Sequence, residues 1–508
     1  MFTRYVAIAV LLAVVIGGSF IYVMTQQRGA NPTETTTETT TPTTTPSTEN
    51  IIDYMKKLGY EVLKLRNEGY ATVHMEYLLL SAKYHYLHGD ISKTLELLNE
   101  VSKELESPEL LPELPITEFE VADGYVNITK APTVEDFVPI GKVFVLTSKG
   151  YLDYPRNDPQ WKLSCFIMLA IGKSEDGKYF MYQGRLPLKP EEGSFRPRVF
   201  IGGKWVILNI TFAGPLYYDD GEKFRYPTVY QYDISGRYMQ WISYDPEGRR
   251  WFHAIKDLES GTELISIKAK VVSPPTWLGQ WGSLYLAHGV YPKRPGVDLW
   301  SGFWDICEAS MKVTYNGITK EYHGLFVFDR ASHRIYGIED IRKAGPLGAP
   351  LEFSCMVIYQ DNLVITVAYS RNPSTLNLSF PLQHQLRVEL LNRNLTLITN
   401  DIVFREFGNE LQPSEFNIIA KFSDKTYLDI KGKVVNYWPP KWVGGRGTWW
   451  NPKGAFTWGR AFTVWEGGLV INSEYIPVNA VGVGEFTRYS EGQQPEVTTC
   501  PLDGSCWK

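Results

Sequence analysis

Cysteine is scarce in this chain, and it has no concentrated positive charge. Five cysteines among 508 residues are too few for a disulfide scaffold. No CxxC pair or His/Cys cluster indicates a bound metal, and we expect no cofactor. The net charge is −5 and no block of Lys and Arg stands out, which argues against a nucleic-acid partner because phosphate binding needs a concentrated basic face.

The few cysteines fall into two groups. Cys500 and Cys506 enclose PLDGS near the end of the chain, and they predict a short disulfide-closed loop if the protein is exported. Cys165, Cys307 and Cys355 lie in apolar, strand-like contexts. These contexts favour buried thiols, with a bridge between one pair as the alternative.

A charge-free run opens the chain. Residues 5–24 contain no charged side chain, and twenty helical residues span about 30 Å, the thickness of one hydrocarbon core. No cleavage site follows, so we predict an uncleaved transmembrane anchor over 1–28 rather than a signal peptide. Arg4 and Arg28 flank the run and leave its orientation nearly balanced.

The segment after this run indicates export. Residues 29–50 form a Thr/Pro/Glu tract, typical of a glycosylated stalk or a plain linker. Four N-x-[ST] sequons follow, at Asn127, Asn209, Asn377 and Asn394. We therefore predict a single-pass cell-membrane protein whose bulk is extracellular and carries glycans.

Residues 51–108 have helical periodicity and predict a small three-helix module. The three apolar stripes are Ile51, Tyr54, Met55, Leu58 and Val62; Val73, Tyr77, Leu80, Tyr84 and Leu87; and Ile91, Leu95, Leu98, Ser102 and Leu105. Gly89 and Asp90 predict a helix stop followed by an N-cap. Residues 84–101 resemble half of a tetratricopeptide hairpin, but no 34-residue repeat is found. His85 and His88 lie one turn apart without a third ligand, so metal binding is not expected there. If the protein is a surface binder, the module would be a docking element for a protein partner or a spacer.

From about residue 115 onward, the pattern is that of short β-strands. β-Branched and aromatic residues alternate with polar ones between Gly, Pro, Asn and Asp, without a helix-length segment. So long a region exceeds one β core, and it predicts two antiparallel units over 115–275 and 276–495, divided near 274–282, with a tail over 496–508. Closed barrels are favoured because closure removes exposed edges, and a pair of sandwiches is the alternative.

Tryptophan gathers in two places. The clusters are Trp277, Trp281, Trp300 and Trp304; and Trp438, Trp442, Trp449, Trp450, Trp458 and Trp465. Large aromatic side chains usually fill β cores. Trp449 and Trp450 are adjacent, however, and would point to opposite faces of a strand, so one of them would meet a second barrel, a ligand or a glycan.

The segment 316–337 combines a tight turn with an unusual strand. Asn316-Gly317 predicts a hairpin turn. Alternation places Leu325, Val327 and Asp329 on one face and Phe326, Phe328 and Arg330 on the other. Both faces are apolar, so we expect cover on both sides. A buried Asp329 would be either paired or neutral, and a neutral carboxyl is a proton donor. The alternative is that Asp329 and Arg330 close the strand with turn hydrogen bonds.

A second strand near the end of the β region has the same form. In residues 482–490, Glu485 shares a face with Val483, Thr487 and Tyr489. Asp329 and Glu485 would form a pair if both strands face one cavity.

These motifs resemble a known family. The pattern YNG…GLFVFDRASHR, an aromatic Gly-rich segment around Trp458, VGVGEFTRY, and residues 249–282 are similar to the lipocalin-like hydrolases and carotenoid hydratases, which include hydroxyneurosporene synthase and the AttH-type proteins. The likeness covers about 240–490 and implies two tandem lipocalin-like barrels. The acid-Trp-Trp-Tyr motif that the family carries in its first half is absent; residues 149–163 are the nearest segment.

The resemblance leaves the activity open between binding and catalysis. We expect a binder of a lipid, pigment or other apolar small molecule. An acid-catalysed hydratase or hydrolase acting on an isoprenoid or lipid, and a glycan-binding surface protein, are the alternatives. In the hydratase hypothesis Asp329 or Glu485 donates the proton and His333 or Tyr489 admits water. The candidate ligand contacts in all these cases are Trp300, Trp304, Arg330 and Trp458.

Overall fold

The computed structural model describes most of the predicted helical and β regions. The described residues are 48–68, 70, 72–110, 126–127, 161–187, 195–213, 217–219, 222–226, 228–245, 247–273, 276–278, 290–291, 299–334, 352–370, 384–409, 412–444 and 456–489. The anchor, the stalk before residue 48, Trp449-Trp450, Asn377 and the Cys500/Cys506 loop lie outside them. No helix within the described residues is long and apolar enough to cross a membrane.

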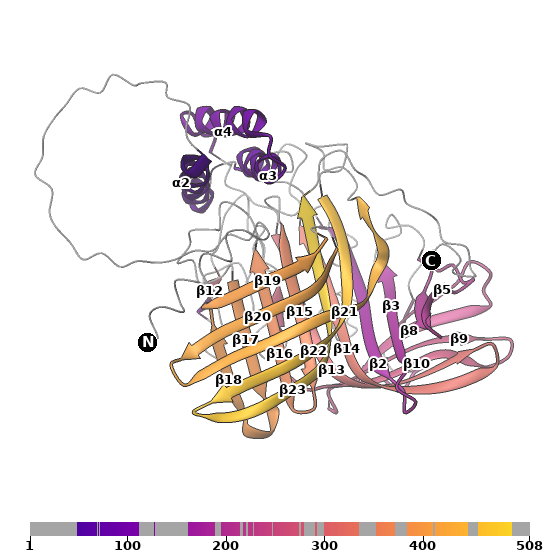
Figure 1. Ribbon diagram of the computed structural model, residues 1–508. Helices are drawn as coiled ribbons and strands as arrows, with labels where there is room; N and C mark the ends of the chain where they lie inside the picture. The colour runs from indigo at the N-terminus through magenta and orange to yellow at the C-terminus, as the bar shows by residue number, and fades with distance from the viewer. Residues whose placement is uncertain are drawn as a thin grey trace, which may run out of the picture.

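Three helices form the predicted module. They are α2 (Thr48–Asn67), α3 (Val73–Leu87) and α4 (Ile91–Leu105), drawn in indigo in Figure 1. The Asp90 side chain caps α4 by accepting from the Lys93 N–H, and Gly89 has the positive φ of 79° expected at a helix stop. A shared apolar core holds the helices together; it includes Met55, Leu79 and Leu98.

Helix α3 is buried on two sides, which the single predicted stripe did not show. Leu79 faces the other helices, whereas Leu80 packs against Tyr489 of the β region. Tyr77 and Tyr84 each place a ring centroid 5.8 Å from that of Tyr489. The predicted stripe that contains these two tyrosines therefore binds the module to a sheet. Lys83 reinforces the contact with a buried salt bridge to Glu352.

The rest of the described chain is mainly β and forms two curled antiparallel sheets, seen side by side in Figure 1. The first sheet has the order β5-β4-β3-β2-β14-β13-β10-β9-β8-β7-β6, with β11 paired to β13. Its strands are β2 (Trp161–Lys173), β3 (Tyr179–Pro187), β4 (Arg198–Ile201), β5 (Lys204–Ile207), β6 (Tyr217–Asp219), β7 (Thr228–Tyr232), β8 (Tyr238–Asp245), β9 (Arg250–Asp257), β10 (Glu263–Val271), β11 (Thr276–Leu278), β13 (Leu299–Tyr315) and β14 (Ile318–Arg334). A short separate pair joins β1 (Val126–Asn127) to β12 (Val290–Tyr291).

The second sheet has the order β18-β17-β16-β15-β23-β22-β21-β20-β19. Its strands are β15 (Phe353–Gln360), β16 (Leu363–Ser370), β17 (His384–Leu390), β18 (Leu395–Thr399), β19 (Ile402–Gly408), β20 (Pro413–Ser423), β21 (Thr426–Gly444), β22 (Phe456–Ile471) and β23 (Glu474–Tyr489), with a 3-10 turn at Leu391–Arg393. Strands β2 and β14 of the first sheet lie against β15 and β23 of the second.

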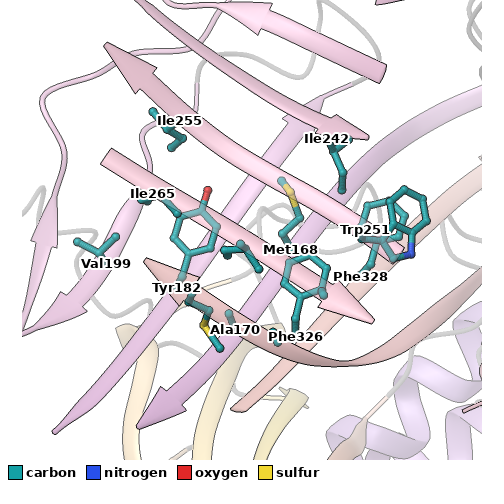
Figure 2. Close-up of a cluster of buried hydrophobic side chains, with 14 of the residues drawn as sticks. Met168, Ala170, Tyr182, Val199, Ile242, Trp251, Ile255, Ile265, Phe326 and Phe328 are labelled. Atoms are coloured by element: carbon teal, nitrogen blue, oxygen red, sulfur yellow. The ribbon is translucent and has the colours of Figure 1, made fainter. Parts of the chain in front are cut away.

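Both sheets curl around packed interiors. The first surrounds a cluster that includes Met168, Tyr182, Trp251, Phe326 and Phe328, whose side chains converge in Figure 2. A cluster of the same kind, including Ile365 and Trp465, fills the second. Side chains of the protein itself thus occupy both interiors.

Closure of the two sheets differs from the expected complete barrels. In the first, Phe212 bridges Phe195 beside β4 and Asp233 beside β7, so a short segment joins the two sides. In the second, the edge strands β18 and β19 follow one another in sequence, and no ladder pairs them within the described residues.

The hairpin over 299–334 has the predicted turn and the predicted faces. Asn316 and Gly317 have positive φ values of 51° and 76°, and Tyr315 opposes Ile318. On β14, Phe326 and Phe328 enter the interior of the first sheet, whereas Leu325 and Val327 join a cluster between the sheets. The strand is therefore covered on both sides.

The boundary expected near 274–282 is wrong. Strands β13 and β14 follow that segment, yet β13 pairs with β10 and β14 pairs with β2, so both belong to the first sheet. Within the described residues, the division falls between Arg334 and Glu352. Proline, glycine and tryptophan near 274–282 suggested a linker, but local composition cannot reveal the pairing of β14 with the distant β2.

Phe326→Ala should lower the free energy of unfolding by about 3–5 kcal/mol, because it removes a fully buried ring from the first interior. Ile318→Ala, on the same strand but 63% exposed, should change it by less than about 0.5 kcal/mol. Chemical denaturation followed by tryptophan fluorescence measures both. Equal effects of the two substitutions would contradict the described packing of β14.

Candidate functional site

A layer of buried side chains lies between the two sheets. We call it the inter-sheet layer; its core consists of Leu169, Ile171, Met181, Phe200, Trp205, Trp304, Ile306, Leu325, Val327, Phe353, Cys355, Val357, Tyr359, Val364, Ala368, Trp438, Phe462 and Val483. These residues come from both sheets and are mostly apolar. Charged groups at such a place must be compensated or neutral.

Asp329 reaches this layer because of strand alternation. It follows Leu325 and Val327 on the same face of β14, and its register neighbours are Trp304 on β13 and Ile167 on β2. The residue is 4% exposed. The predicted burial of this carboxyl is thus confirmed, and its position is between the sheets rather than inside one of them.

Glu485 approaches the same place from the second sheet, and an arginine joins the two acids. Arg460 on β22 pairs in register with Glu485 on β23. Its guanidinium donates to Glu485 Oε2 from Nη2 at 3.0 Å and from Nε at 3.2 Å. The same Nη2 lies 3.6 Å from Asp329 Oδ2. The structure therefore unites Asp329 and Glu485, and we call these three residues the acid–arginine group.

The surroundings of Asp329 favour its neutral form. Burial raises the pKa of Asp329 to about 7, the negative charge of Glu485 acts in the same direction, and Arg460 and the Trp304 indole act against them. One arginine cannot fully compensate two carboxylates in an apolar layer. At neutral pH a substantial share of the molecules therefore carries a protonated Asp329.

Aromatic rings and further polar atoms border this group. Trp205 and Trp438 have ring centroids 5.2 Å apart, and the Arg198 guanidinium lies 3.9 Å from the Trp438 ring centroid. Among the described residues, Asp329 Oδ1, Trp205 Nε1 and Gln183 Oε1 are buried without a hydrogen-bond partner. Such atoms are suited to contact a ligand that carries a polar group.

The outcome differs among the other predicted site residues. Trp304 lies in the inter-sheet layer, while the side chains of Trp300, Arg330, His333 and Trp458 lie outside the described residues. Tyr489 is about 13 Å along β23 from Glu485 and packs against α3, so the structure does not place it at the carboxyls.

The predicted modification sites have a mixed outcome. Cys307 and Cys355 are buried free thiols, which confirms that expectation for two of the three internal cysteines. The side chain of Cys165 lies outside the described residues. Asn209 and Asn394 are exposed, and their glycosylation stays a prediction.

Sequence reasoning missed Arg460, because a single arginine in WGRAF carries no signal of its partners. It also missed Asp305, another buried acid, on β13. Asp305 points into the interior of the first sheet, where Oδ2 accepts from Trp251 Nε1 at 2.8 Å. Burial raises its pKa to about 6. The alternation that placed Asp329 also applies to Asp305, in the run WDICEAS.

Comparisons with known proteins give a loose likeness of shape. No protein-family profile and no curated protein matches the sequence. The chain is similar to the crystal structure of CghA with Sch210972, at 11% identity and a TM-score of 0.38, over 65% of this chain and 89% of that one. It is also similar to a protein designated AttH from Nitrosomonas europaea, at 9% identity and a TM-score of 0.33, over 65% and 93%. TM-scores of this size concern overall shape and say nothing about the acid–arginine group.

Asp329→Asn should change how stability depends on pH. Since the pKa of Asp329 is about 7 in the folded chain and about 3.9 in an unfolded one, the folded state holds the extra proton between these values. The wild type therefore loses stability as the pH rises from 4 to 7, by up to about 1.4 kcal/mol per pH unit. The variant lacks this loss, so its stability relative to wild type should increase over that range.

Urea unfolding at pH 4.5, 5.5, 6.5 and 7.5 measures this difference. Asp176→Asn is the control: Asp176 is exposed and its pKa is lowered by Ser174 and Lys320, so its effect should be weak and of opposite sign. Parallel stability curves for wild type and Asp329→Asn would show that Asp329 titrates normally.

Proposed function

We propose that the inter-sheet layer binds a small, largely apolar molecule and that Asp329 contacts it as a neutral carboxylic acid. The observation that carries this proposal is the position of Asp329, buried beside Arg460 and Glu485 at the edge of an apolar and aromatic layer. Packed side chains fill the layer as they fill the two sheet interiors, and the layer is the better candidate because the acid–arginine group lies there.

The chemistry of the layer defines the class of ligand. Its apolar residues favour a hydrocarbon body such as that of an isoprenoid or a lipid. A protonated Asp329 can donate one hydrogen bond to a hydroxyl or carbonyl oxygen of the ligand. Trp205 and Trp438 offer ring surfaces to unsaturated carbons.

The raised pKa of Asp329 favours one second function, the acid-catalysed hydration of a carbon–carbon double bond. In that reaction Asp329 transfers its proton to one alkene carbon, and water adds to the other. The proton that the added water loses returns to the Asp329 carboxylate, so that the product is an alcohol. Ring faces of the layer would stabilise the transient cation.

Binding can be tested with retinol, a fluorescent isoprenoid alcohol. Asp329→Leu should weaken retinol binding at least tenfold because it removes the only polar contact we assign, whereas Asp329→Asn keeps a neutral donor and should bind within about threefold of wild type. Asp305→Leu is the matched control. It removes a buried acid that lies on the neighbouring strand β13 and faces the interior of the first sheet. Fluorescence titration measures all four proteins.

The same variants separate binding from catalysis. The substrate for this test is an apolar alkene recovered from organic extracts of the protein and identified by mass spectrometry. If the protein is a hydratase, the alcohol product contains oxygen from ¹⁸O-labelled water. Asp329→Asn would then bind the alkene but not convert it. Equal losses of binding in Asp329→Leu and Asp305→Leu would contradict the proposed site.

We also propose that the chain is anchored to the cell membrane with its bulk outside. The charge-free run over 5–24 and the Thr/Pro/Glu tract after it support this proposal. The chain should stay with membranes after alkaline carbonate extraction and be cleaved by protease added to intact cells. Release of the full-length chain by carbonate would exclude an uncleaved anchor.

A further inference from the structure

The helical module carries a group of metal-ligating side chains away from the inter-sheet layer. His74 lies in the first turn of α3, and Glu100 and Glu104 lie in the last two turns of α4. One ligand atom from each of the three residues lies within 4.8 Å of the other two. We propose that His74, Glu100 and Glu104 bind a divalent transition-metal ion of the zinc class.

The geometry suits such an ion. Glu100 and Glu104 are four residues apart and therefore project from the same face of α4. His74 Nδ1 lies 2.5 Å from Glu104 Oε1, so the imidazole already faces the carboxylates. One imidazole nitrogen and two carboxylate oxygens form a three-ligand set of the kind that zinc accepts, with a water molecule in the fourth position.

The supporting helices are held by their own core. Leu78 and Leu79 of α3 pack with Leu97, Leu98 and Val101 of α4. The Asp90 cap fixes the start of α4 after the short turn that joins the two helices. The backbone positions of the three ligands are therefore set by packing that does not involve the ligands.

Charge gives a second reason to expect a cation here. Two glutamates one turn apart repel each other, and the C-terminal end of α4 is a place where the helix dipole disfavours negative charge. A divalent ion compensates the charge of both carboxylates.

The histidines that stand out in the sequence are not part of this group. At the other end of α3, His85 Nδ1 lies 3.5 Å from Asp90 Oδ2, and the His88 ring is tilted against the Tyr84 ring with the centroids 4.1 Å apart. Their spacing of one turn drew attention to them, whereas His74 pairs with residues of the following helix, a contact that only the helical hairpin creates.

Zinc binding to the purified full chain tests the proposal. Isothermal titration with ZnCl₂ at pH 7.5 should show one saturable site per chain. His74→Ala, Glu100→Gln and Glu104→Gln should each weaken it at least tenfold. Binding of Co²⁺ should produce visible absorption bands of a low-coordinate N/O site, and these should vanish in His74→Ala, which a simple His–Glu salt bridge cannot explain.

Glu96→Gln and His85→Ala are matched controls on the same two helices, since they remove a carboxylate and an imidazole outside the group. Both should bind zinc within about twofold of wild type. Circular dichroism of His74→Ala checks that its helices persist. Zinc affinity that is unchanged in His74→Ala, or no saturable binding up to millimolar ZnCl₂, would overturn the proposal; neither result bears on the ligand proposed for the inter-sheet layer.

Discussion

Strand β14 packs between two apolar surfaces, and the arrangement of the charged residues depends on this packing. Phe326 and Phe328 fill the interior of the first sheet, while Leu325 and Val327 meet the second sheet. Because side chains alternate, burial of one set fixes the direction of the other. Asp329 continues the second set and is thereby carried into the inter-sheet layer, where solvent cannot stabilise its charge.

The second sheet places both an arginine and another acid beside this buried acid. Arg460 binds Glu485 closely and reaches Asp329 at a longer distance. A single arginine with one carboxylate would be a simple buried ion pair, whose net stabilisation is small because of desolvation. The third member leaves the group with two carboxyls and one arginine, and together with burial it raises the pKa of Asp329. This property distinguishes the acid–arginine group from the Arg387–Glu389 pair on β17, which contains one charge of each sign.

The sequence predicted local features well and long-range pairing poorly. The three helices, the Asn316-Gly317 turn and the two covered faces of β14 follow from periodicity and turn chemistry, which depend on neighbours in sequence. The pairing of β14 with β2 depends on strands far apart in the chain, so the boundary between the sheets was misplaced.

The site shows the same limit. Asp329 and Glu485 were found because an acid among apolar residues is conspicuous in a strand. Arg460 was missed because its meaning comes from register with Glu485 and from contact with the other sheet. His74 was missed because its partners lie on the next helix.

The pairing of β2 with β14 also constrains how the protein is made. During synthesis β2 leaves the ribosome long before β14. Until β14 emerges, β2 lacks the strand that pairs with it in the middle of the first sheet. The β13–β14 hairpin is the last part of the first sheet to be synthesised, and it forms the middle of that sheet. Its strand β14 also forms part of the surface against which β15 and β23 pack. Nascent chains shorter than about 334 residues would thus expose β2 as a bare, apolar edge, a natural client surface for a chaperone.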